Sequence, residues 1–369
     1  MPTAAAAVAS SPQQHQLYST ILPKNKHDPT QPSTSSDFEE ESLLPPPSTP
    51  NKSSTNNGIT LPPNLLRIVN STSKFTSHKL RLCLKLNEAD FTNPKISFEY
   101  APTEFDPTTE PQFVFSVGTH KIFSFDTYDT VFPSKTSQPE ICVNCLPELL
   151  QTLFAGFDAS LMYFGAISRP AMRAEKQDLL YSRIQYSPTS NGIFVCAIQW
   201  IFKLIEEYRV KKRDIRYSVR ISALHYSQKS DKVIDLLSDF ANEDNSENEV
   251  KCTEDPALGI IIENRSEIRV ETVDQALYYL DRVHDHRASE EEEIQRSSHT
   301  FFYLTLYRYE TQITGLQSGK SRLCFIDLGL GEKNSKTGYM TMPVLGQILL
   351  SIFQGQKHLP SRYVTVLFY

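Results

Sequence analysis

The sequence lacks any apolar run approaching the roughly 20 residues that a membrane-spanning helix requires. Its two longest apolar stretches, 192–204 and 344–353, are interrupted by Gln199, Lys203 and Gln347. The alanine-rich beginning of the chain also lacks the basic segment and hydrophobic stretch of a secretory signal peptide. We therefore expect a cytosolic protein without a membrane span.

A large excess of one charge is also missing. The 369 residues contain 37 basic and 43 acidic side chains, a net charge of -6, which argues against general nucleic-acid binding. The six cysteines are scattered, as is usual in a reducing compartment. Cys142 and Cys145 form a CxxC pair, but no second pair follows at zinc spacing, so we expect two core cysteines of a helix rather than a structural zinc site.

The segment from Met1 to about Thr76 is rich in Ser, Thr, Pro, Asn and Gln and has few aromatic residues. Such a composition cannot bury enough apolar surface to offset the loss of chain entropy, so we predict that residues 1–76 are disordered. An acidic and hydrophobic patch at residues 37–44 could dock a signalling or scaffold protein. A solvated linker is the alternative interpretation.

Hydrophobic periodicity predicts an ordered domain from Lys79 to Tyr369. Period-two or short buried patterns predict strands at residues 80–86, 160–164, 216–226, 300–309 and 322–327. Helical spacing predicts helices at residues 139–154, 192–208, 272–287 and 342–353. Strands and helices alternate along the chain, which indicates an α/β domain built around one central sheet.

The stretch from Gly156 to Met172 reads as a buried strand running into a turn, which is where a nucleotide-binding protein places its phosphate loop. Gly165 fits the first glycine of the pattern G-x-x-x-x-G-K-[ST]. The next positions do not fit: Pro170 has no N–H to donate, Ala171 has no ammonium group, and Met172 offers a thioether where magnesium prefers oxygen. Arg169 is the cation that remains. Taken alone, this window favours an ordinary strand and turn.

Four stretches in register, spread over roughly 290 residues, resemble the kinesin motor domain. They are FDTYDTVF at 125–132 with SQPE at 137–140; GFDASLMYFG at 156–165; RSSH at 296–299 with LCFIDLGLGE at 323–332; and PVLGQILLSI at 343–352 with HLPSR at 358–362. The resemblance implies a three-layer, P-loop NTPase-like α/β fold with a central mixed sheet. Because kinesin heads continue beyond the last motif, it also implies that the domain is incomplete at its C-terminus.

The resemblance is greatest to the divergent, ATPase-deficient kinesin-eleven class, which acts in cell migration and axon guidance. The sequence GIFVCAIQWIFKLI at 192–205 and the RSSH form of switch I carry this similarity. It implies a vestigial nucleotide pocket formed by Gly165, Ser168, Arg169, Ala171, Met172, Ser298, His299, Asp327 and Glu332.

Two further departures weaken that pocket. Leu330 replaces the switch II glycine whose amide faces the γ-phosphate, and Ser297 replaces the switch I arginine that bridges to Glu332. Arg296, one residue earlier, could substitute for it. The acidic run 290–293 precedes these residues; it either faces the pocket and repels phosphate, or forms a solvated charge run, which is the interpretation we favour.

The resemblance implies a kinesin-like protein that binds microtubules and acts as a non-motile scaffold or signalling kinesin of the cytoplasm and cytoskeleton. Hydrolysis needs the lysine, the magnesium ligand and the γ-phosphate sensor together, so we expect no ATPase activity and no cofactor. ATP and magnesium would bind only if the pocket is less degenerate than it reads. The alternative is an ATP-driven microtubule motor, which would need Arg169, Arg173 or Lys176 to replace the missing lysine. The residues expected to contact tubulin are Lys333, Lys336, Lys357, His358 and Arg362.

Overall fold

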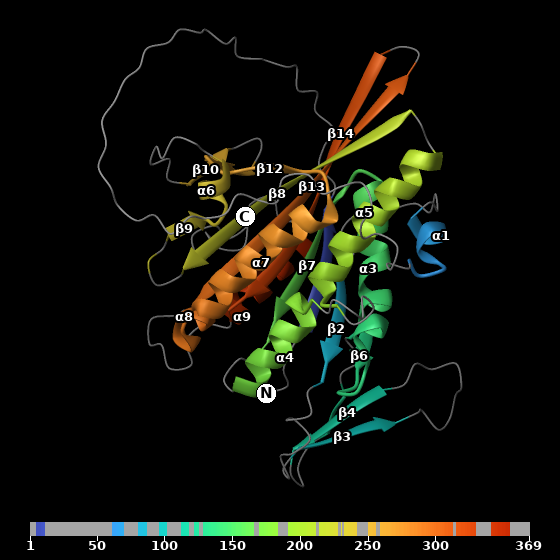
Figure 1. Cartoon of the computed structure of the whole chain (residues 1–369). Helices are drawn as coiled ribbons and strands as arrows, with labels where there is room; N and C mark the ends of the chain where they lie inside the picture. Colours follow the sequence, from blue (N-terminus) through green and yellow to red (C-terminus); the bar gives the residue numbers. More distant parts are fainter. Residues whose placement is uncertain are drawn as a thin grey trace.

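A computed structural model describes a three-layer arrangement of helices around one mixed sheet (Figure 1). The residues described are 5–11, 61–69, 80–86, 96–101, 112–117, 122–124, 128–165, 170–183, 191–211, 214–227, 230, 232–241, 250–255, 259–312, 315–329 and 341–354. None of the helices within these ranges combines the length and the hydropathy needed to cross a bilayer.

The central sheet has nine strands, in the order β12-β8-β13-β14-β7-β1-β2-β6, with β9 paired to β8. Their bounds are β1 Ala5–Ser11, β2 Leu80–Lys85, β6 Thr130–Phe132, β7 Asp158–Phe164, β8 Ile215–Ser227, β9 Lys232–Asp235, β12 Ile268–Val270, β13 Ser298–Gln312 and β14 Gly315–Leu328. Two small sheets stand apart from it, one of β3 (Ile96–Ala101), β4 (Gln112–Val117) and β5 (Ile122–Ser124), the other of β10 (Lys251–Asp255) and β11 (Gly259–Glu263).

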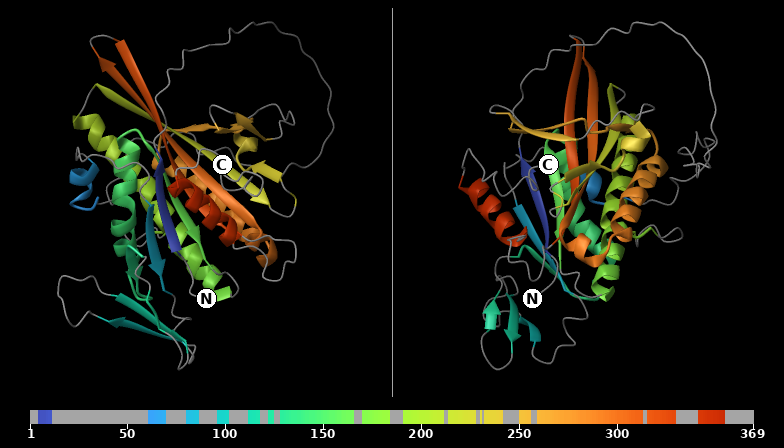
Figure 2. Two further views of the ribbon diagram at one scale, coloured as in Figure 1. Left: turned by 180° about the vertical axis from the view of Figure 1, so that it is seen from behind. Right: turned by 90° about the vertical axis from the view of Figure 1, so that its left-hand side faces the viewer.

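Helices cover both faces of the sheet, and most of them lie on one side. The helices α3 (Gln138–Phe154), α4 (Pro170–Tyr181), α5 (Ile193–Lys211) and α7 (Val273–Ser289) lie on one face, and α9 (Thr341–Phe353) lies on the other (Figures 1 and 2). The shorter helices are α1 (Leu65–Val69), α6 (Ser238–Ala241) and α8 (Glu292–Arg296). The core splits accordingly: Phe194 and Phe325 stack in the larger cluster, while Leu345 packs with Phe301 and Ile326 in the smaller one.

All four predicted helices appear, and the sequence explains where two of them begin. Pro139 lies at the first turn of α3, where its missing N–H costs nothing. Thr272 caps α7 by accepting a hydrogen bond from the Gln275 amide at 3.2 Å. The predicted core position of the CxxC pair is confirmed, because Cys142 and Cys145 are buried and the Cys145 Sγ lies 4.0 Å from the Cys83 Sγ.

The central prediction, that 160–164 and 323–327 are neighbouring strands, is confirmed. β7 and β14 run parallel with Leu323 opposite Ala159 and Leu328 opposite Phe164. Asp158 helps to set this register. Its carboxylate accepts a hydrogen bond from the Arg322 amide at 2.8 Å and forms an ion pair with the Arg322 guanidinium at 3.0 Å. The two strands therefore end side by side.

The prediction of disorder up to Thr76 differs from the structure in two places. β1 lies between β2 and β7 and pairs antiparallel with both, so its backbone groups are satisfied without a large apolar side-chain set of its own. Leu65 and Val69 of α1 are buried against α3, where two apolar side chains anchor a short helix. The rest of that predicted region lies outside the described residues.

Candidate functional site

The candidate site lies at the carboxyl ends of β7 and β14, where an open α/β sheet usually places its ligand site. Asp327 is the next-to-last residue of β14 and pairs with Thr300 in the neighbouring strand β13. Ser298 and His299 begin β13 at the same edge. Helices α4 and α7 pass in front of these strand ends and supply Lys176 and Arg287. The structure thus brings together three of the predicted pocket residues, Ser298, His299 and Asp327.

Asp327 is almost fully buried and is held by the protein's own cations. Its Oδ1 forms an ion pair with the Lys176 ammonium, and its Oδ2 lies 3.5 Å from the Arg287 Nε. The Tyr181 hydroxyl donates a hydrogen bond to Oδ2 at 3.4 Å. Lys176 is 5% exposed and Asp327 is 1% exposed, so water does little to screen this pair. The charge of this carboxylate is therefore already neutralised within the protein.

Burial perturbs the groups around Asp327. It lowers the pKa of Lys176 to about 8, against the opposing attraction of Asp327, so the amine is charged near neutral pH. Burial and then the negative charge of Asp327 raise the pKa of Tyr181 well above its usual value of 10, so its hydroxyl stays a donor. The result is a small buried network with one carboxylate, two cations and a phenol.

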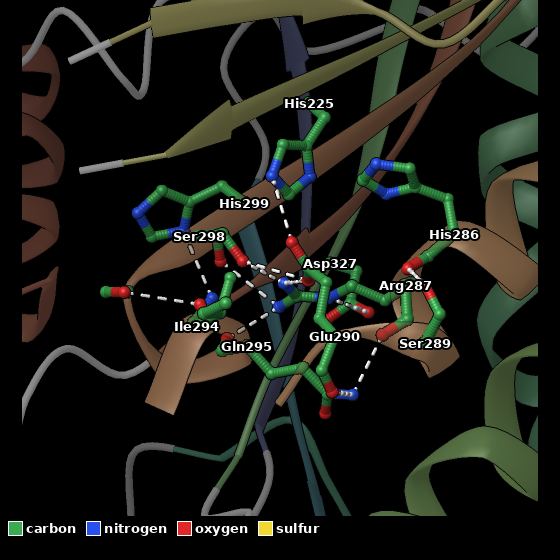
Figure 3. A network of polar contacts seen from close by, with 12 residues as sticks. His225, His286, Arg287, Ser289, Glu290, Ile294, Gln295, Ser298, His299 and Asp327 are labelled. Atoms are coloured by element: carbon green, nitrogen blue, oxygen red, sulfur yellow. Dashed lines mark hydrogen bonds and ion pairs between the residues drawn. The ribbon is translucent and has the colours of Figure 1, made fainter. Parts of the chain in front are cut away.

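Arg287, near the end of α7, is the centre of a second set of contacts (Figure 3). Its Nη1 forms an ion pair with the Glu290 Oε2 at 2.9 Å and donates to the Ser298 hydroxyl. Its Nη2 donates to the Gln295 carbonyl at 2.8 Å and to the Ser298 carbonyl at 3.1 Å. Such a fixed planar donor ties α7, α8 and β13 together. It also occupies the hydroxyl of Ser298, one of the predicted switch I residues.

His299 is buried and neutral. Burial, followed by the positive charge of Arg287, holds its pKa well below 6.5. Its Nδ1 accepts a hydrogen bond from the Gly329 amide at 3.1 Å, and the same amide donates to the Ser298 carbonyl at 3.0 Å. A Cβ at Gly329 would lie 2.4 Å from the Arg296 carbonyl oxygen. Glycine is therefore required where β14 leaves the sheet beside switch I.

The acidic run 290–293 does not behave as one solvated charge run. Glu290 turns inward with a 9% exposed side chain, and its Oε1 lies 3.1 Å from the His225 Nε2. Burial alone would raise the pKa of Glu290, but the hydrogen bond from His225 and the charge of Arg287 lower it to about 2. Glu292 pairs with Arg173 at 3.1 Å, while Glu291 and Glu293 are exposed. The interpretation of residues 290–293 as a solvated charge run is therefore wrong for Glu290, because its carboxylate is bound by the buried side chains of Arg287 and His225.

The remaining predicted positions are placed only in part. Gly165 follows β7 and is buried; α4 then begins at Pro170, and Ala171 and Met172 lie in its first turn, which gives the strand, loop and helix order of a phosphate loop. Ser168, Arg169, Leu330 and Glu332 lie outside the described residues. The five residues expected to contact tubulin, Lys333, Lys336, Lys357, His358 and Arg362, lie outside them as well.

Sequence reasoning named Lys176 only as one of three cations, with Arg169 and Arg173, that would replace the missing lysine of the loop in a working motor. In the structure Lys176 pairs with Asp327, whereas Arg173 pairs with Glu292. Tyr181 and Arg287 were missed, because each looks like an ordinary helical residue in the sequence. Tyr181 and Asp327 are 146 positions apart, so no local pattern links them.

Comparison with known proteins agrees with this geometry. Residues 116–348 match the family described as kinesin motor domain. The chain is 36% identical over 287 residues to the kinesin-like protein vab-8 of Caenorhabditis briggsae, covering 78% of this chain and 24% of that protein. It is 34% identical over 261 residues to human kinesin-like protein KIF26B, covering 66% and 12% respectively. The chain thus spans a quarter or less of the length of these relatives.

A solved structure shows the same fold. The structure described as that of a fast kinesin superposes with a TM-score of 0.56 at 20% identity, covering 75% of each chain.

Proposed function

Since this chain belongs to the kinesin motor domain family and is related to vab-8 and KIF26, we propose that it is a microtubule-binding protein whose nucleotide pocket no longer works. On this proposal it acts on the cytoskeleton as a non-motile scaffold or signalling kinesin. A role in cell migration or axon guidance belongs to the same proposal. Its activity does not depend on ATP hydrolysis.

One observation carries the proposal: Asp327 is buried and paired with Lys176 and Arg287. In a working phosphate site, a carboxylate at this place faces a magnesium ion and its waters. Here two internal cations take that role. Nucleotide binding would have to separate a buried ion pair, and that separation opposes binding. The residues Pro170, Ala171 and Met172 add to the effect, since they offer neither an ammonium group nor a hydroxyl to a triphosphate.

Two measurements on this chain test the proposal. Titration with fluorescent ADP and ATP, with and without magnesium, should give no saturable binding at micromolar concentrations. Co-sedimentation with microtubules should give the same bound fraction, within about twofold, after apyrase treatment and in ATP or a non-hydrolysable analogue. Magnesium-dependent micromolar affinity, or release from microtubules by ATP, would instead support the motor alternative. Failure to co-sediment in every condition would contradict microtubule binding itself.

The tubulin-facing side can be tested by charge reversal. Lys333→Glu with Lys336→Glu should lower the bound fraction severalfold, because tubulin is acidic and its partner needs a local basic face. Arg209→Glu with Lys211→Glu is the matched control, since both residues are exposed at the end of α5, on the opposite face of the sheet from α9. Equal losses in both variants would mean that only the overall charge matters.

A further inference from the structure

Three possible metal ligands meet beside the candidate site, one from β8 and two from the end of α7. His225 is near the end of β8, His286 is near the end of α7, and Glu290 follows α7. One ligand atom from each lies within 4.8 Å of the other two. The two imidazole rings have centroids 4.9 Å apart and lie together above Arg287 and Glu290 (Figure 3).

Two nitrogens of this cluster are buried without a hydrogen-bond partner among the described residues. They are the Nδ1 atoms of His225 and His286. His225 is 3% exposed, so its ring has little access to water. A buried polar atom without a partner costs about 1–3 kcal/mol, and folded proteins rarely leave two such atoms side by side. His286 therefore offers an unused Nδ1 to an ion, whereas His225 would offer the Nε2 that faces Glu290.

The spacing and the types of side chain suit a transition metal ion. His225 Nε2 and Glu290 Oε1 are 3.1 Å apart, close to the roughly 3.3 Å that separates two tetrahedral ligands with bonds of about 2.0–2.1 Å. The second carboxylate oxygen is held by Arg287 and the backbone carbonyl of Glu290 by Gln295, which orients the side chain as outer contacts do in metal sites. Two imidazoles exclude a preference for magnesium or calcium, which take oxygen ligands.

Positive charges limit the affinity of such a site. The Arg287 guanidinium contacts Glu290, and the Lys176 ammonium is bound to the neighbouring Asp327, so both cations repel a metal ion. His299 is neutral and adds no positive charge. The ion also has to replace the direct contact between His225 and Glu290. We therefore expect a dissociation constant on the order of micromolar, weaker than that of a closed structural zinc site.

We propose that His225, His286 and Glu290 form a binding site for Zn²⁺, with a water molecule completing the coordination. The ion would tie the end of β8 to the end of α7, next to switch I, and is distinct from the magnesium of a nucleotide. The proposal is independent of microtubule binding, because its test measures metal alone.

The test is titration of the metal-free protein with Co²⁺ and then Zn²⁺. One Co²⁺ per chain should bind with a visible absorption typical of nitrogen and oxygen ligands, and Zn²⁺ should displace it and raise the melting temperature. His286→Gln should weaken binding at least tenfold. This side chain is only half-buried, so the variant should fold, which circular dichroism will verify. His284→Gln, on the same helix, is the matched control and should bind as the wild type does.

Two results would overturn the proposal. The first is wild-type protein that binds no Co²⁺ or Zn²⁺ at 100-fold excess over the expected dissociation constant, or that binds equally well in the His286→Gln variant. The second is a strong near-ultraviolet thiolate band with Co²⁺, which would place the metal on the buried cysteines instead.

Discussion

At the scale of single residues, Lys176 decides the state of the site. It neutralises Asp327 inside the protein, where an unpaired carboxylate would be costly. Its side chain extends from α4 and also approaches the Tyr163 ring, with 5.5 Å between the ammonium nitrogen and the ring centroid. An ammonium group from the interior of the helix thus stands where the phosphate loop itself supplies none.

Replacing Lys176 with methionine keeps the volume and removes the charge. We predict that Lys176→Met lowers the free energy of unfolding by about 3 kcal/mol, because Asp327 then keeps only the longer contacts to Arg287 and Tyr181. Urea denaturation measures this. Arg183→Met is the control: Arg183 is 43% exposed in its pairs with Asp274 and Asp281, so the loss should be below about 1 kcal/mol. Similar losses in both variants would refute the importance of burial.

Gly329 offers a second prediction at this scale. An added methyl group would press on the carbonyl oxygens of Arg296 at 2.4 Å and Ser298 at 2.6 Å, and backbone atoms cannot turn aside as side chains do. Gly329→Ala should therefore cost at least about 2 kcal/mol. At Gly319, which lies within β14, an added Cβ meets nothing within 4 Å, so Gly319→Ala should change stability little. Thermal unfolding compares the two, and equal melting temperatures would contradict the steric argument.

At the scale of elements, Glu290 ties the end of α7 to β8 and to the start of β13. Its partners His225, Arg287 and Ser298 come from these three elements. A negatively charged Glu290 holds these elements together. A protonated Glu290 would no longer neutralise the positive charge of the buried Arg287. This connection is therefore sensitive to acid.

The sign of this pH dependence follows from the lowered pKa of Glu290. Its value is about 2 in the folded protein and about 4.5 unfolded, so its stabilisation is complete above pH 4.5 and is lost as the pH falls toward 2. Melting temperatures measured across this range should fall less steeply in Glu290→Gln than in the wild type. Glu291→Gln, at the exposed neighbouring position, should follow the wild-type curve. Parallel curves for all three proteins would exclude Glu290 as the cause.

At the scale of the whole molecule, the proposed loss of nucleotide binding rests on several departures at once. The loop lacks its lysine and its hydroxyl, Leu330 replaces the switch II glycine, and Asp327 is paired internally. Repair of one part should therefore restore only part of the activity.

We predict that Pro170→Gly, Ala171→Lys and Met172→Thr together give measurable ADP binding but almost no ATP hydrolysis. The new lysine and hydroxyl can hold diphosphate and magnesium, whereas Leu330 still replaces the glycine that the resemblance expects to face the γ-phosphate. Addition of Leu330→Gly should then raise turnover, measured by phosphate release with microtubules. Hydrolysis at a kinesin-like rate in the triple variant alone would show that Leu330 is harmless. An absence of ADP binding would place the fault in our alignment of the loop.

The sequence by itself determined the family, the α/β class, the main helices and the adjacency of 160–164 and 323–327. These features follow from hydrophobic periodicity and from motifs that lie within short stretches of chain. The tertiary structure alone decided what fills the site and how β1 enters the sheet. Lys176 and Arg287 pair with the buried Asp327, Glu290 pairs with Arg287, and β1 pairs with the backbone of β2 and β7. Such pairings join residues far apart in the chain, and no local pattern encodes the low dielectric surroundings that give them their strength.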